Sequence, residues 1–413
     1  MMDELPKSEH LILLVGGNPL PNAVAGKLLM QPGGTASLIH TSDTADTAER
    51  LKNWLIAQAQ VNVVLKQVDG ADPDSIRDGT RQRLCDVKTA VVGLNYTGGT
   101  KAMAVHAYRA AEQWAQERKI KPVYSYLDAQ SLRMVLDLEK RSVPLSHVLQ
   151  LRLIEDLMAL HQWAVKNQPK TAPILPEIAK ELLALHVANK LAAWHEWQEV
   201  ELRGNCRRQD RPDKWLSKTA LNKIMLSWPQ PPELASLVNA LQTELNQDER
   251  GLYLATATTA AGFKSPEELC QQLNGGYWLE SCVLQALQQL APSHHLHDVC
   301  MGLRVPTIGD KDFELDVVAM RGYQLYGFSC GIDSDSVSGG RSHLKQKLFE
   351  AQVRAQQLGG DEARVALVSC ADDPAGLQAE VRRDLAPHIR VFGRQDLPDL
   401  TTKLGDWIQR QGC

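Results

Sequence analysis

Short apolar runs alternate with amphipathic stretches along about the first 140 residues. The apolar runs predict buried strands at residues 10–15, 36–40, 61–68, 89–94, 122–127 and 132–138. Between them, apolar residues at helical spacing predict helices that begin near residue 23, span 47–59, pass through Ile76 and Leu84, and follow residue 100. This alternation predicts a mostly parallel, three-layer α/β domain in which the last two strands form a hairpin.

The middle of the chain has a different pattern. Leucines at 149, 153, 157 and 160 predict a helical segment over 145–166, which is either a plain linker or part of a dimer interface. From about residue 168 to 249, prolines interrupt short helical stretches, so we expect a small helical or winged-helix module. Its stretch 199–223 has seven Lys or Arg against four Asp or Glu. DNA binding there is the less favoured interpretation, because a basic excess on a loop usually faces solvent.

The last third of the chain returns to strands and helices. After Gly275-Gly276 comes a helix with one apolar face, and a second long helix ends at Gly359-Gly360. Strands are predicted at residues 313–318, 324–330, 365–369 and 389–392. We therefore predict an α/β protein with a sheet domain at 1–145, a helical or winged-helix part at 146–249 and a second α/β domain at 250–413.

Composition excludes several classes of protein. The 413 residues are 44% hydrophobic and 23% charged, which is ordinary for a globular protein, and the net charge of −4 gives no overall basic field for nucleic acid. The eight cysteines form no CxxC pair and are expected to be reduced. Since no signal peptide and no apolar run of about 18 residues is present, we expect a cytoplasmic protein without a membrane span.

The stretch Asn95-Tyr96-Thr97-Gly98-Gly99-Thr100-Lys101-Ala102-Met103 carries the first candidate chemistry. It lies between a predicted strand and a predicted helix, which is where an open α/β sheet binds ligands. Its glycines allow close approach, its threonines supply hydroxyls, and the first helical N–H groups with Lys101 attract phosphate. A plain turn with a threonine cap would have the same residues. Two further loops end strands of this sheet, Asn18-Pro19-Leu20-Pro21-Asn22 and Thr41-Ser42-Asp43-Thr44.

The run Asn-x-Thr-Gly-Gly-Thr-Lys-x-Met after a strand, together with the Pro-x-Pro-Asn loop, resembles the CRISPR-associated Rossmann-fold (CARF) domains. That resemblance implies a homodimer that binds a cyclic oligoadenylate, with cyclic tetra-adenylate as the activating ligand, although the sequence does not determine the ring size. The residues implied in ligand binding are Asn18, Pro19, Thr41, Ser42, Asn95, Thr97, Gly98, Gly99, Thr100, Lys101 and Met103.

The C-terminal part is similar to the PD-(D/E)xK restriction-endonuclease core, which holds Mg2+ or Mn2+. By that resemblance Glu280 and Asp316 are metal ligands and catalytic residues. The (D/E)xK element itself falls on Ser329-Cys330-Gly331, which has neither carboxylate nor lysine. Glu314 could replace the carboxylate, because it shares a strand face with Asp316. Lys345, our first choice, or Lys347 could replace the lysine.

Two functions from different classes follow. The first is a cyclic oligoadenylate-activated, metal-dependent nuclease of type III CRISPR antiviral defence that cleaves DNA, RNA or both. The alternative is an inactive sensor whose nuclease-like domain binds nucleic acid or a partner protein, which the missing (D/E)xK residues favour. A nucleotide-dependent metabolic enzyme is the poorest explanation, because Gly16-Gly17-Asn18 lacks the GxGxxG spacing.

Overall fold

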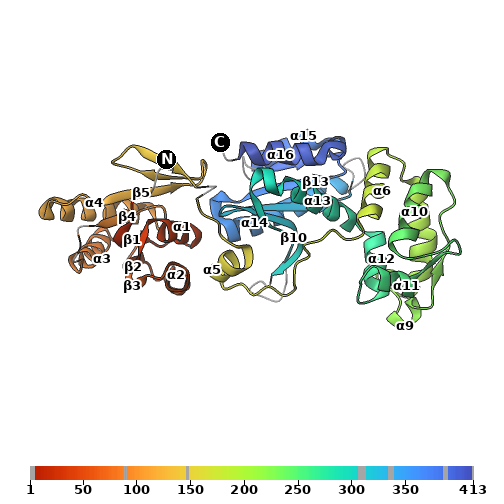
Figure 1. The fold of residues 1–413 in the computed structure, drawn as a ribbon, viewed down its shortest axis with the longest axis horizontal. Helices are drawn as coiled ribbons and strands as arrows, with labels where there is room; N and C mark the ends of the chain where they lie inside the picture. Colours follow the sequence, from red (N-terminus) through yellow and green to blue (C-terminus); the bar gives the residue numbers. More distant parts are fainter. Residues whose placement is uncertain are drawn as a thin grey trace.

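The computed structural model describes residues 5–87, 89, 91–145, 148–305, 313–333, 339–384 and 389–411. It contains a seven-stranded sheet, a largely helical module and a five-stranded sheet (Figure 1). The helical module comes between the two sheets in the sequence, but it lies beyond the C-terminal sheet, at the far end of the molecule from the first sheet. None of the described helices is long and apolar enough to cross a membrane.

The first sheet has the strand order β3-β2-β1-β4-β5-β6-β7. The first five strands in this order, β3-β2-β1-β4-β5, are parallel to one another. β6 and β7 continue the sheet, each antiparallel to its neighbours. The strands are β1 Ser8–Leu14, β2 Met30–His40, β3 Asn62–Gln67, β4 Val92–Asn95, β5 Val123–Asp128, β6 Arg133–Leu136 and β7 Arg141–Pro144. The fold class predicted for this part is confirmed, and β7 is an addition to the predicted hairpin.

Helices cover both faces of this sheet. The apolar residues of α1 and α2 lie in one core, and those of α3 and α4 lie in another on the opposite face. The helices are α1 Leu20–Leu29, α2 Ala45–Ala59, α3 Pro73–Cys85 and α4 Lys101–Arg118. Since successive strand side chains point to opposite faces, the continuous apolar run Leu11–Leu14 of β1 is buried on both sides.

The expected helix over 145–166 is only partly present. A π-helical turn at Leu153–Met158 leads into α5 Ala159–His161, and the described residues 148–152 and 162–166 on either side are not helical. Before this helical part, Leu151 N–H donates to the carbonyl of Gly322 at 2.9 Å. Asp298 then accepts from Leu153 N–H at 2.8 Å and so caps the helical start. These contacts come from the C-terminal domain, so local spacing could not indicate them.

The middle module packs on the C-terminal domain through one apolar core. Its helices are α6 Pro176–Val187, α7 Ala192–Trp197, α8 Gly204–Cys206, α9 Lys218–Leu221, α10 Ala235–Glu244, α11 Leu254–Ala260 and α12 Pro266–Asn274. A π-helical turn at Gln198–Arg203 and a 3-10 turn at Pro232–Leu234 complete the set of helical segments. Several residues of the basic stretch pair with acidic neighbours, as Arg208 does with Asp210 at 2.7 Å.

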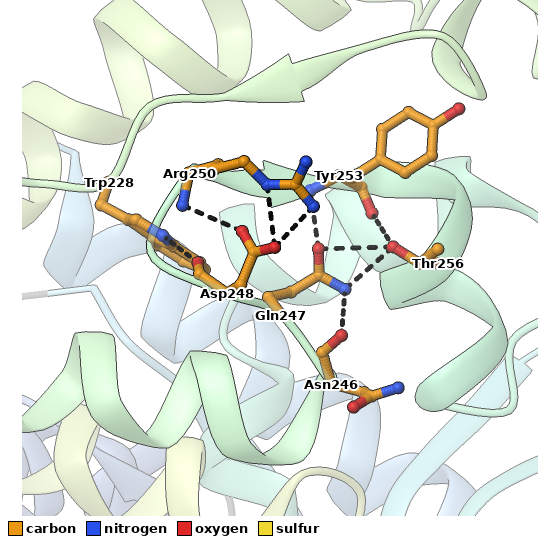
Figure 2. Close-up of polar contacts among 7 residues, drawn as sticks. All are labelled: Trp228, Asn246, Gln247, Asp248, Arg250, Tyr253 and Thr256. Atoms are coloured by element: carbon orange, nitrogen blue, oxygen red, sulfur yellow. Dashed lines mark hydrogen bonds and ion pairs between the residues drawn. The ribbon is translucent and has the colours of Figure 1, made fainter.

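Two short strands of this module, β8 Met225–Leu226 and β9 Leu252–Tyr253, pair antiparallel, but α10 lies between them in sequence, so they do not form a hairpin wing. Figure 2 shows the polar contacts that hold the turn before β9. Gln247 Oε1 accepts from Tyr253 N–H at 2.8 Å, and Asp248 Oδ1 accepts from Arg250 N–H at 2.9 Å. The turn is therefore internally hydrogen-bonded, and the helical or winged-helix nature of the module stays a prediction.

The C-terminal sheet has the order β10-β11-β12-β13-β14, with β10, β11 and β12 antiparallel and the last pairs parallel. The strands are β10 Leu296–Val305, β11 Phe313–Arg321, β12 Gln324–Gly331, β13 Arg364–Ser369 and β14 Arg390–Phe392. The helices are α13 Tyr277–His294, α14 Gly340–Gly359, α15 Pro374–Asp384 and α16 Leu400–Arg410, and 3-10 turns occur at Gly360–Glu362 and Arg394–Asp399. The predicted α/β class of this part is also confirmed.

The two sheet domains meet around the end of α14. His161, which follows the π-helical turn, has Nε2 2.9 Å from the carbonyl oxygen of Leu358. On the other side, Trp54 of α2 donates from Nε1 to Asp156 Oδ1 at 3.2 Å. Apolar residues of both domains belong to one continuous core across this junction. The boundaries at 145 and 249 stay predictions.

Candidate functional site

The first candidate site is the edge of the first sheet at the point where its strand order reverses. β1 lies between β2 and β4. The loop after β1 leads toward β2 on one side, and the loop after β4 leads toward β5 on the other. Such a switch point is where doubly wound sheets bind ligands. A Cβ on Gly16 would lie 3.1 Å from the backbone nitrogen of Gly99, so the two loops touch. The structure thus brings together the two loops predicted from the sequence.

The glycine pair of the second loop is required by packing. A Cβ on Gly98 would overlap the carbonyl oxygen of Leu14, and Gly99 has φ +75, which favours glycine. Both glycines remain partly exposed. The loop backbone is therefore held against β1 while it stays open to a ligand.

Three of the predicted ligand residues support the loop from inside. Asn95 is fully buried, and its Oδ1 accepts from Thr97 Oγ1 at 2.8 Å. Thr97 Oγ1 also accepts from Leu127 N–H at 2.7 Å, which ties the loop to β5. Met103 is fully buried beneath Gly99. These side chains position the loop, and the sequence could not separate this role from ligand contact.

The start of α4 is open to an anion. Thr100 Oγ1 accepts from Met103 N–H at 3.1 Å and so caps the helix. Thr100 and Lys101 are exposed. Lys101 therefore adds a full charge to the partial positive charge of the helix N-terminus.

The loop after β1 reaches the C-terminal domain. Asn18 Oδ1 accepts from Leu20 N–H at 2.9 Å, which caps α1, while Pro19 is buried. Asn18 Nδ2 is buried without a hydrogen-bond partner among the described residues, and it lies against Gly360 after α14. This contact is not visible in any local sequence pattern.

The loop after β2 lies at the same edge of the sheet. Thr41 N–H donates to Thr44 Oγ1 at 3.0 Å, so this loop is also closed on itself. Ser42 is exposed, and its hydroxyl donates to Asp43 at 3.3 Å. Thr41 and Ser42 remain candidates at this edge of the sheet.

The second candidate site lies in the C-terminal sheet around Asp316 of β11. Asp316 Oδ2 accepts from Cys330 N–H at 2.8 Å and lies 3.4 Å from Ser329 Oγ, both on the neighbouring strand β12. Lys347 of α14 places its Nζ 3.7 Å from the same oxygen and donates to the carbonyl of Cys330 at 2.8 Å. An ammonium group therefore lies beside the strand position where the (D/E)xK lysine is missing.

The two lysines considered from the sequence occupy different places. Lys345 pairs with Glu380 of α15, whereas Lys347 reaches Asp316. Although burial alone would lower the pKa of Lys347, the attraction of Asp316 raises it. The structure thus brings Lys347 to Asp316 and places Lys345 in a surface ion pair. Both lysines border the apolar stripe of α14, which is why helical periodicity could not choose between them.

Glu280 of α13 is 8% exposed. Burial, and then the charges of Asp316 and Glu314, raise its pKa well above the usual value. Burial also raises the pKa of Asp316, against the opposing effect of Lys347. Glu314 projects from the same face of β11 but is more exposed and pairs with Arg304 at 2.9 Å. The structure therefore brings the three predicted carboxylates to one face of the sheet.

These residues fit a hard divalent cation. Glu280 and Asp316 are both poorly solvated carboxyl groups, and the positive charges of Lys347 and Lys170 act on Glu280 against the effect of its burial. Oxygen ligands of this kind suit Mg2+ or Mn2+. In the part of the chain that the structure describes, no group of three or more Asp, Glu, His or Cys is already assembled for a metal. An ion held by Glu280 and Asp316 would therefore need water or further oxygen atoms.

Residues 267–411 match a family model described as the Card1-like endonuclease domain. Solved structures with a similar fold include Can2 from Sulfobacillus thermosulfidooxidans in complex with cyclic tetra-adenylate, at 16% identity and a TM-score of 0.67 over 97% of this chain and 99% of that one. Protein VC1899 from Vibrio cholerae is 17% identical, with a TM-score of 0.68 and 98% coverage of both chains. A type III CRISPR defence DNA nuclease activated by cyclic oligoadenylate is 18% identical, with a TM-score of 0.51 over 94% of this chain and 53% of that one. A sequence comparison with curated proteins gave no match.

The fold and the two sites define a class of proteins in which a Rossmann-like domain is joined to a nuclease-like domain. Within that class, the match of residues 267–411 confirms that the C-terminal part is similar to the Card1-like endonucleases, and the solved structures confirm the overall fold.

Proposed function

We propose that this protein is a cyclic oligoadenylate-activated, metal-dependent nuclease of type III CRISPR antiviral defence, which acts as a homodimer on DNA, RNA or both. The observation that carries this proposal is the position of Lys347, whose Nζ lies 3.7 Å from Asp316 Oδ2. It provides a lysine beside the acidic pair although Ser329, Cys330 and Gly331 stand at the (D/E)xK position.

The edge of the first sheet where its strand order reverses would bind the ring of adenylates. Gly98, Gly99 and the exposed Lys101 would contact phosphates, together with the N–H groups at the start of α4. The complex of Can2 with cyclic tetra-adenylate supports this choice of ligand. A cyclic ligand with rotational symmetry suits two identical sites that meet at a two-fold axis. Binding would favour one of two arrangements of the dimer and so act on the C-terminal domains.

In the C-terminal site, Glu280 and Asp316 would hold Mg2+ or Mn2+. Once bound, the ion would supply an activated water and neutralise charge on the phosphodiester. Lys347 would lie next to the scissile phosphate and stabilise the charge that develops on its oxygens. Cys330 N–H and Ser329 would hold the Asp316 carboxylate in place.

The alternative is a sensor without catalysis, in which the C-terminal domain only binds nucleic acid or a partner protein. Two observations favour it: the missing carboxylate at Ser329, and the hydrogen bond that Lys347 gives to the carbonyl of Cys330. In this case the ion pair between Lys347 and Asp316 would simply stabilise the fold.

A cleavage assay separates the two functions. Plasmid DNA and single-stranded RNA would be incubated with the full-length protein and Mn2+ or Mg2+, with and without cyclic tetra-adenylate. Asp316→Ala tests the site. We expect cutting that requires both the ligand and Asp316. Tight ligand binding by calorimetry without any cutting would reject the nuclease and leave the inactive sensor.

A further inference from the structure

A hollow of about 310 Å³ lies at the edge of the C-terminal sheet, in a part of the molecule that neither proposed site uses. It is lined by residues of α15, β14 and α16 and by the chain just after α16. Its volume is at the lower end of the range for small-molecule sites, roughly 300–1,000 Å³. β14 is the edge strand, and β12 and β13 separate it from β11, which carries Asp316. The hollow is therefore distinct from the nuclease-like site.

The sequence pattern of α16 brings charged side chains to this hollow. Leu404 and Ile408 are buried in the core, whereas Lys403, Asp406 and Arg410 are exposed. Residues three, four or seven positions apart lie on one side of a helix, and these three all line the hollow. The outer side of α16 therefore presents two cations and one carboxylate to it.

Two arginines complete the lining from other elements. Arg382 is exposed near the end of α15, and Arg390 is half-buried in β14. The guanidinium carbon of Arg390 lies 5.3 Å from the centre of the Phe392 ring, a cation–π contact that orients this side chain. Trp407 also lines the hollow, but its side chain is 8% exposed and its ring meets Phe392 edge-on. Cations from three elements thus surround a mostly covered aromatic ring.

The basic side chains of the hollow lack acidic partners. Among the described residues, no hydrogen bond or ion pair joins the side chain of Arg382, Lys403 or Arg410 to a carboxylate. Elsewhere on α15, by contrast, Glu380 accepts from Arg341 at 2.7 Å. The hollow therefore has four cations against one carboxylate, in a chain whose net charge is −4. Because like charges repel one another, an anion that neutralises them is stabilised here.

This set of groups selects a compact anion. Guanidinium groups hold phosphate oxygens in pairs through their planar N–H groups, and a lysine adds a point charge. Several cations around one small hollow suit a chain of linked phosphates, in which negative charges are also closely spaced. Because Trp407 is mostly covered, little ring surface is available for a base to stack on. The phosphate chain, and not a nucleoside, is then the part of the ligand that is recognised.

The hollow is also connected with the first domain. Gln411 lines it, and the side-chain oxygen of Gln411 accepts from Arg364 Nε at 3.0 Å. Arg364 is buried, and its Nη2 donates to the carbonyl of Ala129, just after β5, at 3.5 Å. An anion in the hollow would therefore lie one side chain away from a buried arginine that contacts both domains.

We propose that this hollow binds a small polyphosphate, either inorganic or the phosphate chain of a nucleotide. Arg382, Lys403 and Arg410 contact its oxygens from two helices, and Arg390 contacts them from the edge strand. Asp406 opposes binding through its like charge. This site goes beyond the proposed nuclease function, since it requires neither cleavage nor cyclic tetra-adenylate.

The test is isothermal titration calorimetry of sodium tripolyphosphate, ATP and AMP into the full-length protein, in EDTA. The hollow variant Lys403→Ala/Arg410→Ala is compared with Arg211→Ala/Lys223→Ala, which removes the same two residue types from the exposed surface of the helical module. Alanine is a good helix former, so α16 should persist in the hollow variant. We expect this variant to bind tripolyphosphate at least about tenfold more weakly than the parent, and the control pair to bind like the parent.

The three probes separate the possible sources of the ligand. If the phosphate chain is recognised, tripolyphosphate and ATP should bind the parent with affinities within about threefold of each other, and AMP at least about tenfold more weakly. ATP binding more than about tenfold tighter than tripolyphosphate would overturn recognition through the phosphate chain. Asp406→Asn should bind tripolyphosphate roughly threefold more tightly than the parent, because a like charge is removed. Such a gain cannot result from a failure to fold.

Unchanged tripolyphosphate affinity in the hollow variant would overturn the site. So would a loss of affinity confined to Lys101→Ala, because the anion would then bind at the start of α4. Failure of the nuclease proposal is distinct from both outcomes, since it is a lack of cleavage by the parent protein, whatever the hollow binds.

Discussion

Asn18 in the ligand loop of the first domain lies directly against Gly360 at the end of α14 of the nuclease-like domain. A Cβ on Gly360 would overlap Asn18 Nδ2, and Gly360 has φ +63. Lys347, which contacts Asp316, belongs to the same helix. Helix α14 therefore contacts the proposed catalytic site through Lys347, and the chain just after its C-terminal end contacts the proposed ligand loop.

Substitution of Gly360 tests whether this contact links the two sites. Gly360→Ala should displace Asn18 and change the affinity for cyclic tetra-adenylate several-fold, besides the cost of about 1–2 kcal/mol for a side chain at positive φ. Gly262→Ala is the matched control, because Gly262 has φ +70 with nothing near its added Cβ. Calorimetry measures ligand affinity, and thermal unfolding measures stability. Equal ligand affinity in the two variants would contradict the link.

The lysine on α14 that serves the nuclease site can be identified by a pair of substitutions. Lys347→Ala should lower the rate of ligand-dependent cleavage by about 100-fold or more, the usual effect of removing a group that stabilises transition-state charge. Lys345→Ala should leave the rate within about threefold, because Lys345 pairs with Glu380 on the surface. Initial rates of cleavage with Mn2+ and cyclic tetra-adenylate measure both. A larger loss from Lys345→Ala would reverse the assignment.

The sequence was sufficient for most strands and helices of the two sheet domains, but not for β10, α15 or α16, and it was sufficient for the edge of the sheet where the ligand loops lie. Strands and helices differ in local periodicity, and parallel strands all end at one edge, so the loops after β1 and β4 had to approach each other. Strand β7, Arg141–Pro144, was missed because it is short and only Val143 of its residues is apolar and buried.

Roles that depend on distant contacts could not be predicted. The linker near Lys170 is extended because it pairs with Met301, which is 131 positions away in the chain. Thr97 belongs to a ligand motif, yet its hydroxyl is occupied by Asn95 and the backbone of Leu127. Motif and periodicity indicate which residues share a region, whereas hydrogen-bond partners are determined by the packing of remote strands.

The ligand loop offers two substitutions with different expected effects, one on ligand affinity and the other on stability. Lys101→Ala should weaken cyclic tetra-adenylate binding several-fold through loss of a charge-assisted phosphate contact, with little change in stability, since Lys101 is exposed. Thr97→Val should instead lower the free energy of unfolding by about 1–3 kcal/mol, because Leu127 N–H loses its acceptor. Calorimetry and thermal unfolding separate the two effects. Unchanged ligand affinity in Lys101→Ala would remove Lys101 from the phosphate site.

The buried Glu280 should make stability depend on pH in a definite direction. Burial, with Asp316 and Glu314, raises its folded-state pKa above the ordinary 4.5. The folded state then binds more protons than the unfolded state, so the stabilising contribution is complete below pH 4.5 and is lost as pH rises toward the folded pKa. Glu280→Gln, which cannot ionise, should therefore gain stability relative to the parent as pH rises from 5 to 8, by at most about 1.4 kcal/mol per pH unit.

Chemical unfolding in EDTA at each pH measures this difference. Its change with pH is the informative quantity, because a difference in packing between the amide and the acid contributes equally at every pH. Addition of Mn2+ should stabilise the parent more at pH 8 than at pH 6, since the ion competes with the proton on Glu280, and should stabilise Glu280→Gln less. Parallel pH profiles of the two proteins without metal would mean that Glu280 ionises as easily in the folded chain as in the unfolded one. A metal effect that is equal at both pH values and in both proteins would mean that the ion binds elsewhere.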